Sequence, residues 1–351
     1  LSLLKQRARV NAPQADGSTA LTWAAHWGDA DMAEALLKAG ADPKLANEFG
    51  VTPLALACVN GNLPVVQKLV GAKANPNVVA RSGETPFLHC VRSGNVETVR
   101  LLMEAKADVN LGEKSRGQTP LMWAVAEKHP DVTKALIDHG ANVNAKSKSG
   151  FTALQFAAQQ GDVESAKLLL AAGANVNDTD PDDGMTALLT AIGSNQLPVA
   201  SLLVESGADV SATSKQGVSA LHYAAPRRNM TEMIKTLLAK GANPNVRQKR
   251  EPEGATPFLL AANAGNVAAM RALVAGGADP KIPTKDKTNA IMIAAGVGRY
   301  ESRGADADKA ALEAIKYAVE LGLDVNARGE NDWTALHGAA YTGADEIVEF
   351  L

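Results

Sequence analysis

The sequence contains few cysteines. Its two, Cys58 and Cys90, form no CxxC pair and do not have the spacing typical of haem or zinc sites. Two cysteines in 351 residues provide no disulfide framework for a fold. They also leave the redox compartment of the protein open.

Aromatic residues are scarce as well, at 4% of the sequence, and neither sign of charge is in excess, with 35 Lys and Arg against 38 Asp and Glu. Proteins that neutralise a phosphate backbone are usually strongly basic, so we expect no nucleic-acid partner. No run of eighteen apolar residues is present, which excludes a membrane span. Hydrophobic residues still make up 46% of the chain, enough for a packed interior.

Catalytic and cofactor motifs are missing too. The sequence has no GxxxxGK[ST], HExxH or GxSxG pattern, and the string from Gly296, GVGRYESRG, lacks the third glycine and the preceding strand of a dinucleotide site. Asp178, Asp180 and Asp182 match the first positions of a calcium loop, but its later glycine and glutamate are absent. The six histidines are scattered over different repeat positions. We therefore expect no enzyme activity, no cofactor and no metal site.

What the sequence does contain is a repeat. A glycine, one variable residue, then Thr or Ser, then Ala or Pro, then Leu or Phe recurs at Gly17, Gly50, Gly83, Gly117, Gly150, Gly184, Gly217 and Gly254. The successive spacings are 33, 33, 34, 33, 34, 33 and 37 residues. Two degenerate units follow at Lys287 and Asp332. This periodicity predicts one repeat array over residues 1–351, with partial repeats at 1–16 and 332–351.

Each unit has the pattern of two short helices and an extended turn. In the unit that starts at Gly150, Thr152 is placed to cap the first helix and Gly161 to end it. A second helical pattern follows and stops at Gly173, before a turn rich in Asn, Asp and Pro. Two such helices cannot bury an apolar face alone, so neighbouring units must stack into a continuous core.

These residues resemble the ankyrin repeat, T-P-L-H-x-A-A followed by a glycine turn and V-x-x-L-L-x-x-G-A-D-V-N, over essentially the whole chain. The resemblance implies an all-α repeat solenoid of stacked helix-turn-helix units with β-hairpin or extended turns. The repeat sequences as a whole resemble those of long bacterial ankyrin arrays, which often follow a secretion signal. This resemblance implies a periplasmic, secreted or cell-surface location, with the cytoplasm as the alternative.

The resemblance also implies where a partner would bind, since the family's contact positions are the hairpin tips and the residues after the Ala-Ala pair of the first helix. Single exposed apolar residues are normal on any surface, but aromatic and arginine anchors are enriched at interfaces. The predicted partner-binding residues are His26, Trp27, Val59, Asn60, Arg92, Ser93, Glu127, Phe151, Gln159, Gln160, Met185, Arg227, Arg228, Arg299, Tyr300 and Trp333.

Several of these residues belong to insertions. The seventh unit is lengthened near Pro226–Met230 and in Val246–Gly254, and both additions are basic. They are interpreted first as solvated loops without a partner, and alternatively as a local site for an acidic partner. The ninth unit gains residues around Arg299 and Tyr300, and we expect Asp306 and Asp308 to cap a helix near Lys309–Leu321.

Trp23 lies one helical turn before Trp27, in the x position of T-P-L-H-x-A-A. The equivalent residues, from Leu56 to Ile293, are mostly bulky, so we expect this column to pack between neighbouring first helices.

The leading hypothesis is a non-enzymatic scaffold that binds a protein partner through its concave face and hairpin tips. The alternative is a structural subunit whose arrays stack into an oligomer or filament. Leu1–Leu4 resembles the second helix of an earlier repeat, and an end without a polar face favours such self-association. A third hypothesis is a small ligand or metal bound within the array.

Overall fold

The computed structural model describes residues 9–298, 301 and 304–351. The chain divides into two compact units, Leu1–Asn175 and Val176–Leu351. The helix expected at Leu1–Leu4 and the contacts expected at Arg299 and Tyr300 lie outside the described residues.

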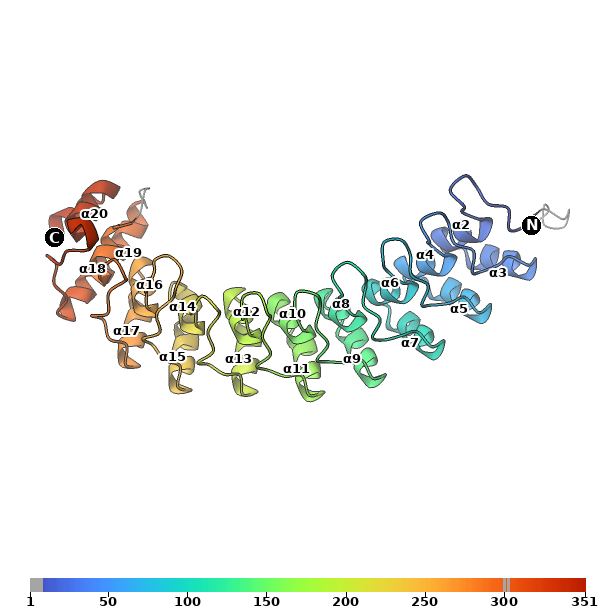
Figure 1. Ribbon diagram of the computed structural model, residues 1–351, viewed down its shortest axis with the longest axis horizontal. Helices are drawn as coiled ribbons and strands as arrows, with labels where there is room; N and C mark the ends of the chain where they lie inside the picture. Colours follow the sequence, from blue (N-terminus) through green and yellow to red (C-terminus); the bar gives the residue numbers. More distant parts are fainter. Residues whose placement is uncertain (1–8, 299–300, 302–303) are drawn as a thin grey trace. The chain divides into compact units, whose positions relative to one another are not determined.

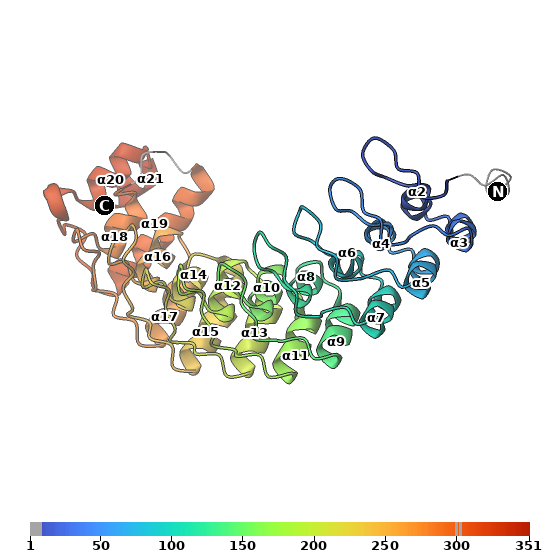
Figure 2. The ribbon, with the colours of Figure 1, turned by 45° about the vertical axis from the view of Figure 1, so that its right-hand side comes forward.

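The first unit is a stack of helix pairs in two layers (Figures 1 and 2). Within each layer every helix packs against the equivalent helix of the next repeat. The layer of first helices contains α2 (Ala20–Trp27), α4 (Pro53–Val59), α6 (Pro86–Ser93), α8 (Pro120–Ala126) and α10 (Ala153–Gln160). The layer of second helices contains α3 (Ala30–Lys38), α5 (Leu63–Gly71), α7 (Val96–Glu104), α9 (Pro130–Asp138) and α11 (Val163–Ala171).

The second unit repeats this arrangement. Its first helices are α12 (Ala187–Gly193), α14 (Ala220–Ala224), α16 (Pro257–Asn263), α18 (Ala290–Ala295) and α20 (Ala335–Thr342). Its second helices are α13 (Leu197–Glu205), α15 (Thr231–Ala239), α17 (Val267–Ala275), α19 (Ala305–Glu320) and α21 (Asp345–Phe350). Two short 3-10 turns, η1 (Arg228–Met230) and η2 (Glu330–Asp332), precede α15 and α20.

The helix ends follow from local sequence. Thr152 accepts a hydrogen bond from the backbone N–H of Gln155, and the left-handed Gly161 (φ 74°) closes the same helix, as the sequence predicts. A proline stands at the first position of α4, α6, α8 and α16, where a missing N–H costs nothing. The predicted all-α repeat solenoid is confirmed, and the hairpin turns hold two isolated bridges and no strand in the described residues.

Polar side chains fasten each repeat to the next. The amide of Asn77 donates to the carbonyl of Lys106 (2.9 Å) and accepts from the N–H of Asp108 (2.8 Å). Asn11, Asn110, Asn144 and Asn245 make equivalent pairs of bonds. These paired bonds recur at five steps of the array, where they help to fix the position of one repeat on the next.

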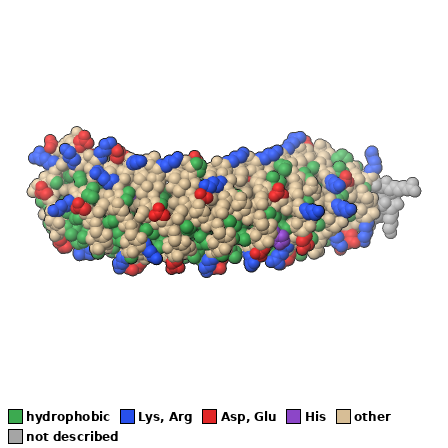
Figure 3. Space-filling view, turned by 60° about the horizontal axis from the view of Figure 1, so that its bottom comes forward, with side chains coloured by type: hydrophobic (Ala, Val, Ile, Leu, Met, Phe, Trp, Pro, Cys, Tyr) green, Lys and Arg blue, Asp and Glu red, His purple; other side chains and the backbone are tan. Residues whose placement is uncertain are grey.

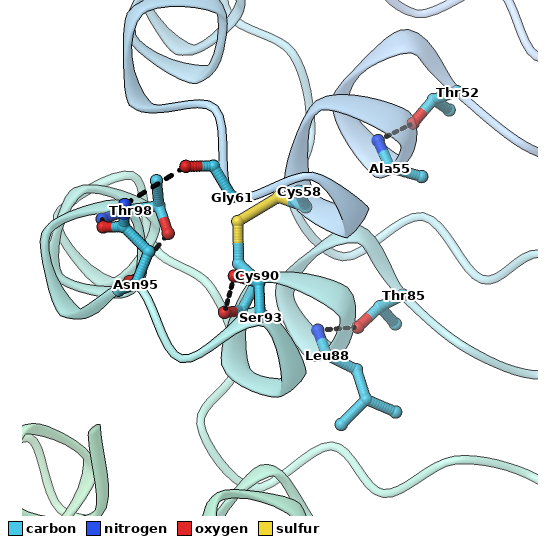
Figure 4. The surroundings of a disulfide bond; sticks show 10 residues. All are labelled: Thr52, Ala55, Cys58, Gly61, Thr85, Leu88, Cys90, Ser93, Asn95 and Thr98. Carbon is cyan, nitrogen blue, oxygen red and sulfur yellow. Dashed lines mark hydrogen bonds between the residues drawn. A yellow bond between two sulfur atoms is a disulfide. The ribbon is translucent and has the colours of Figure 1, made fainter. Parts of the chain in front are cut away.

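The two cysteines form a disulfide, which the sequence analysis did not foresee. Cys58 in α4 and Cys90 in α6 are fully buried, with Cα atoms 4.3 Å apart, and they join two neighbouring first helices (Figure 4). The expectation of a fold without a disulfide framework therefore needs correction. Cys58 is the second residue of the Ala-Ala pair of its repeat and Cys90 the first of its own, and stacking brings these two positions face to face.

The long second helix of the ninth unit begins earlier than predicted. α19 starts at Ala305, so Asp306 and Asp308 lie in its first turn and do not cap it. The N-cap is Gly304, which makes no side-chain cap bond. Carboxylates in a first turn still suit the positive end of the helix dipole.

Candidate binding surface

We define the inner face of each unit as the surface formed by the ends of its first helices and the residues that follow each hairpin glycine. All fourteen predicted site residues among those described are exposed or half-buried there. In the first unit they are His26, Trp27, Val59, Asn60, Arg92, Ser93, Glu127, Phe151, Gln159 and Gln160, and in the second unit they are Met185, Arg227, Arg228 and Trp333.

The inner face begins with an aromatic cluster on α2. The ring of His26 lies 5.7 Å from that of Trp23 and 4.8 Å from that of Trp27, both edge-on. Trp27 is 75% exposed and Trp23 is 40% exposed. The prediction that Trp23 packs between first helices is therefore wrong, whereas Ile293, in the equivalent position, is 4% exposed and fits it. The amide of Asn60 is engaged in the scaffold, since it donates to the carbonyl of His26 (2.8 Å).

Three consecutive repeats of the first unit build one pocket on the inner face. It measures about 370 Å³ and is lined by Val59, His89, Arg92, Ser93 and Glu127. Four of these five are predicted site residues, contributed by α4, α6 and the end of α8. Val59 is 53% exposed, so an apolar side chain lies open to solvent beside charged ones.

The arginine of this pocket is held in place. Arg92 pairs with Glu84 (3.1 Å), and its guanidinium lies over the ring of Trp123, 4.6 Å from the centroid. Burial lowers the pKa of His89, and the charge of Arg92 acts in the same direction while Glu84 opposes it. The indole N–H of Trp123 is buried without a hydrogen-bond partner among the described residues.

A pocket of about 570 Å³ on the inner face of the second unit contains residues from both insertions of the seventh repeat. It is lined by His222, Tyr223, Pro226, Arg227, Arg250, Leu260, Asn263 and Ala264. Arg228, the other predicted basic contact, lies next to it in η1 and is exposed. His222 is buried and donates to the carbonyl of Ala255 (3.1 Å), as the family position implies, and burial followed by the charge of Arg250 lowers its pKa to about 4.

Trp333 lines a further pocket of the second unit, of about 380 Å³, together with Asp286, Glu330 and Tyr341. Its ring lies 6.1 Å from that of Tyr341 and 5.9 Å from that of His337. The predicted contact at Phe151 packs its ring 5.8 Å from that of Phe156.

Three residues that line or support these pockets are not among the predicted contacts: His89, Trp123 and Tyr223. They occupy the x position of T-P-L-H-x-A-A, for which the sequence predicts packing between helices. In the structure they are half-buried. A repeat position that holds large and chemically varied side chains, such as His, Trp and Tyr, indicates a pocket floor. This signal is present in the sequence.

The acidic hairpin at Asp178–Asp182 is organised by hydrogen bonds to the backbone. The buried carboxylate of Asp180 accepts from the N–H groups of Asp182 (3.0 Å), Asp183 (2.7 Å) and Met185 (2.8 Å). Over the described part of the chain, no three His, Cys, Asp or Glu residues converge as metal ligands would. Among the helices that the structure describes, none combines the length and hydrophobicity needed to cross a bilayer.

Comparison with known proteins identifies the family to which this architecture belongs. The family described as ankyrin repeats (3 copies) matches residues 1–80, 54–147, 87–180, 154–248 and 221–302, and ankyrin repeats (many copies) matches residues 307–351. The chain is 32% identical over 182 residues to the nuclear factor NF-kappa-B p105 subunit of Gallus gallus, covering 52% of this chain and 15% of that protein. It is 40% identical over 156 residues to ankyrin repeat and SOCS box protein 3 of Homo sapiens, covering 44% of this chain and 29% of that protein.

A bacterial protein is also similar, the protein PhlB of Serratia liquefaciens, at 44% identity over 62 residues that cover 18% of this chain and 27% of PhlB. The chain thus spans less than a third of the length of each of these three relatives. The family matches, in contrast, cover nearly all of it. Together with the stacked helix pairs, their threonine caps and their glycine turns, these matches show that the chain belongs to the ankyrin-repeat family.

Proposed function

We propose that the chain is a non-enzymatic scaffold that binds a protein partner through its inner face and hairpin tips, the surface that the sequence analysis called concave. Ankyrin repeats are protein–protein interaction modules, and the family is generally non-enzymatic. The observation that carries the proposal is the pocket built by three consecutive repeats around Arg92. An exposed valine, a positioned arginine and an exposed carboxylate meet there, and arginine is enriched among interface anchors.

The surface of the second helices supports this choice. Charged residues pair with each other along one helix there, such as Lys167 with Glu164 (2.8 Å) and Lys134 with Asp138 (2.7 Å). Figure 3 shows one face of the molecule, on which Lys and Arg are interspersed with Asp and Glu and the hydrophobic side chains are scattered among them. Exposed pairs of this kind suit a solvated surface and contribute little to binding.

Site-directed photo-crosslinking tests the proposal. A photoreactive amino acid replaces Trp27 or Glu127 on the inner face, and Met32 or Glu164 on the second helices serves as the matched control. In extracts of the source cells we expect the same protein adduct from both inner-face positions and not from the controls. Adducts of equal yield from both sides would contradict an inner-face site.

The structural alternative is self-association of the arrays, and the same experiment separates it. An adduct with the mass of two chains, together with a sedimentation coefficient that rises with concentration, would favour assembly over partner binding. A concentration-independent monomer would remove this alternative.

We also propose a periplasmic, secreted or cell-surface location in preference to the cytoplasm. The support is the buried Cys58–Cys90 disulfide, because disulfides persist in oxidising compartments and are rare in the cytosol. Alkylation of the denatured protein, after the source cells are quenched in acid, tests it. We expect no free thiol until a reductant is added, and two free thiols in the unreduced protein would contradict the proposal.

A further inference from the structure

The pocket of the second unit joins two features that the sequence shows separately. Both insertions of the seventh repeat contribute an arginine to it, Arg227 from the segment after α14 and Arg250 from the lengthened hairpin. Tyr223 contacts both arginines. Its ring lies 5.6 Å from the guanidinium of Arg250, and its backbone carbonyl accepts a hydrogen bond from Arg227. Insertions far apart in the sequence thus produce one basic pocket.

The charge of this pocket is not neutralised by the chain. Its lining residues include two arginines and neither Asp nor Glu. Within the described residues, no carboxylate lies within 4.0 Å of the side-chain nitrogens of Arg227 or Arg250. His222 in the pocket floor is neutral near pH 7, because burial and the charge of Arg250 lower its pKa to about 4. The pocket therefore has a net positive charge that an anion would balance.

The two acidic residues that follow Arg250 in its loop, Glu251 and Glu253, interact with another cation. Glu253 pairs with Lys285 (2.9 Å), and Glu251 and Glu253 both raise the pKa of Lys285 by their charge. In contrast, within the described part of the chain the guanidinium of Arg250 makes one long hydrogen bond, to the side-chain oxygen of Gln248 (3.4 Å), and lies over the ring of Tyr223. Its guanidinium thus retains donors for a further partner.

Both arginines are positioned before any partner arrives. Arg227 donates to the carbonyls of Tyr223 and Gly193, the latter at 2.8 Å. The amide of Gln248, only 2% exposed, donates to the carbonyls of Arg250 (3.3 Å), Glu251 (3.2 Å) and Pro252 (3.2 Å), and so holds the loop that presents Arg250. Side chains ordered in advance lose less entropy on binding, and a guanidinium matches the geometry of a carboxylate.

We propose that this pocket receives the carboxylate of an Asp or Glu side chain from an acidic, extended segment of the protein partner. The inference rests on the proposed function and adds the chemistry of the partner. The half-buried Leu260 and Asn263 at the pocket wall leave room for the neighbouring residues of the segment, since about 570 Å³ exceeds the size of one side chain.

The probe for this proposal is a fluorescent octapeptide of glutamate, compared with the same peptide made of glutamine. Binding to the whole chain is followed by fluorescence anisotropy at about 0.15 M salt. We expect the glutamate peptide to bind and the glutamine peptide to bind at least tenfold more weakly. No detectable binding of the glutamate peptide at millimolar protein, or equal binding of both peptides, would overturn the proposal.

The matched variants are Arg250→Gln and Lys240→Gln, which remove one positive charge from the pocket and one from the exposed end of the second helix of the same repeat. We expect Arg250→Gln to weaken binding of the glutamate peptide at least tenfold and Lys240→Gln by less than twofold. Arg250→Lys, which keeps the charge and loses the forked donor geometry, should fall between them. Equal losses for Arg250→Gln and Lys240→Gln would show diffuse attraction and overturn the site. Circular dichroism checks that both variants remain folded.

Further results distinguish carboxylate recognition from phosphate recognition, and failure of this proposal from failure of the proposed function. An octapeptide of phosphoserine that binds more than tenfold tighter than the glutamate peptide would overturn carboxylate recognition in favour of phosphate recognition. If inner-face crosslinking finds a partner whose affinity is unchanged by Arg250→Gln, the carboxylate pocket fails and the proposed function stands. If crosslinking finds no inner-face partner, the proposed function itself fails.

Discussion

Reduction of the Cys58–Cys90 disulfide should destabilise the first unit by a predictable amount. The bond closes a loop between residues 32 positions apart in the sequence, and the loss of chain entropy in the unfolded state then corresponds to about 3.7 kcal/mol at 25 °C. Because a repeat array transmits stability mainly between neighbours, the loss should be concentrated in the repeats that contain α4 and α6.

The assay is urea unfolding of the oxidised and the reduced protein, followed by circular dichroism. Both sulfurs are fully buried, so dithiothreitol should reduce the folded protein slowly and the protein in urea rapidly. The double variant Cys58→Ala/Cys90→Ala is the control, and dithiothreitol should leave its unfolding curve unchanged. A difference in the free energy of unfolding between oxidised and reduced protein below about 0.5 kcal/mol would contradict stabilisation by the cross-link, because it would lie at the bottom of the range for a closed loop.

Three further predictions concern the scaffold. Asn77→Ala removes both hydrogen bonds between its repeat and the next, and should lower the free energy of unfolding by about 1–2 kcal/mol in urea titrations. The neutral His222 has a pKa of about 4 when folded and about 6.5 when unfolded, so its contribution to stability is complete above pH 6.5. As pH falls from 6.5 to 4 the unfolded state binds the proton first, and about 3 kcal/mol should be lost. Gly265→Ala would place its Cβ 2.8 Å from the backbone of Ala310 in a left-handed conformation (φ 64°), and should lower the melting temperature markedly.

Each of these predictions has a matched control. Asn77→Asp keeps the acceptor and loses the donor, so it should cost less than Asn77→Ala. His222→Gln removes the titration, and Gln155 already caps its repeat in the equivalent position by accepting from Thr152 N–H (2.9 Å). The stability difference between wild type and this variant should therefore change below pH 6.5, and a constant difference would contradict the assignment. Gly277→Ala shares the left-handed strain (φ 91°) but meets no atom within 4 Å, so a cost equal to that of Gly265→Ala would contradict the packing argument.

The repeat fold could be predicted because each unit carries its own signals. Thr152 and Gly161 define the ends of α10 from hydrogen bonds within a few residues, and the sequence shows the same residues in unit after unit. Such local interactions do not depend on the register between repeats. The start of α19 was wrong by four residues because Gly304, which ends the loop, carries no cap signal that competes with Asp306 and Asp308.

The pockets could be predicted only in part, because they depend on how neighbouring repeats face each other. The exposure of Trp27 and Val59 follows from their position after the Ala-Ala pair. The stacking of Arg92 on Trp123 joins side chains of two repeats, and so does the Cys58–Cys90 bond. The meeting of Arg227 and Arg250 depends on the path of an inserted loop, which the buried Gln248 fixes.

The most direct test of partner binding through the inner face is an affinity comparison of two triple variants, once crosslinking has identified the partner. Trp27→Ala/Arg92→Ala/Glu127→Ala changes the inner face, and Met32→Ala/Arg100→Ala/Glu164→Ala makes the matched changes on the second helices, with the same net charge. We expect at least a hundredfold loss of affinity for the first variant and less than twofold for the second, by calorimetry at one salt concentration. Equal losses for the two variants, or a larger loss for the second, would contradict partner binding through the inner face.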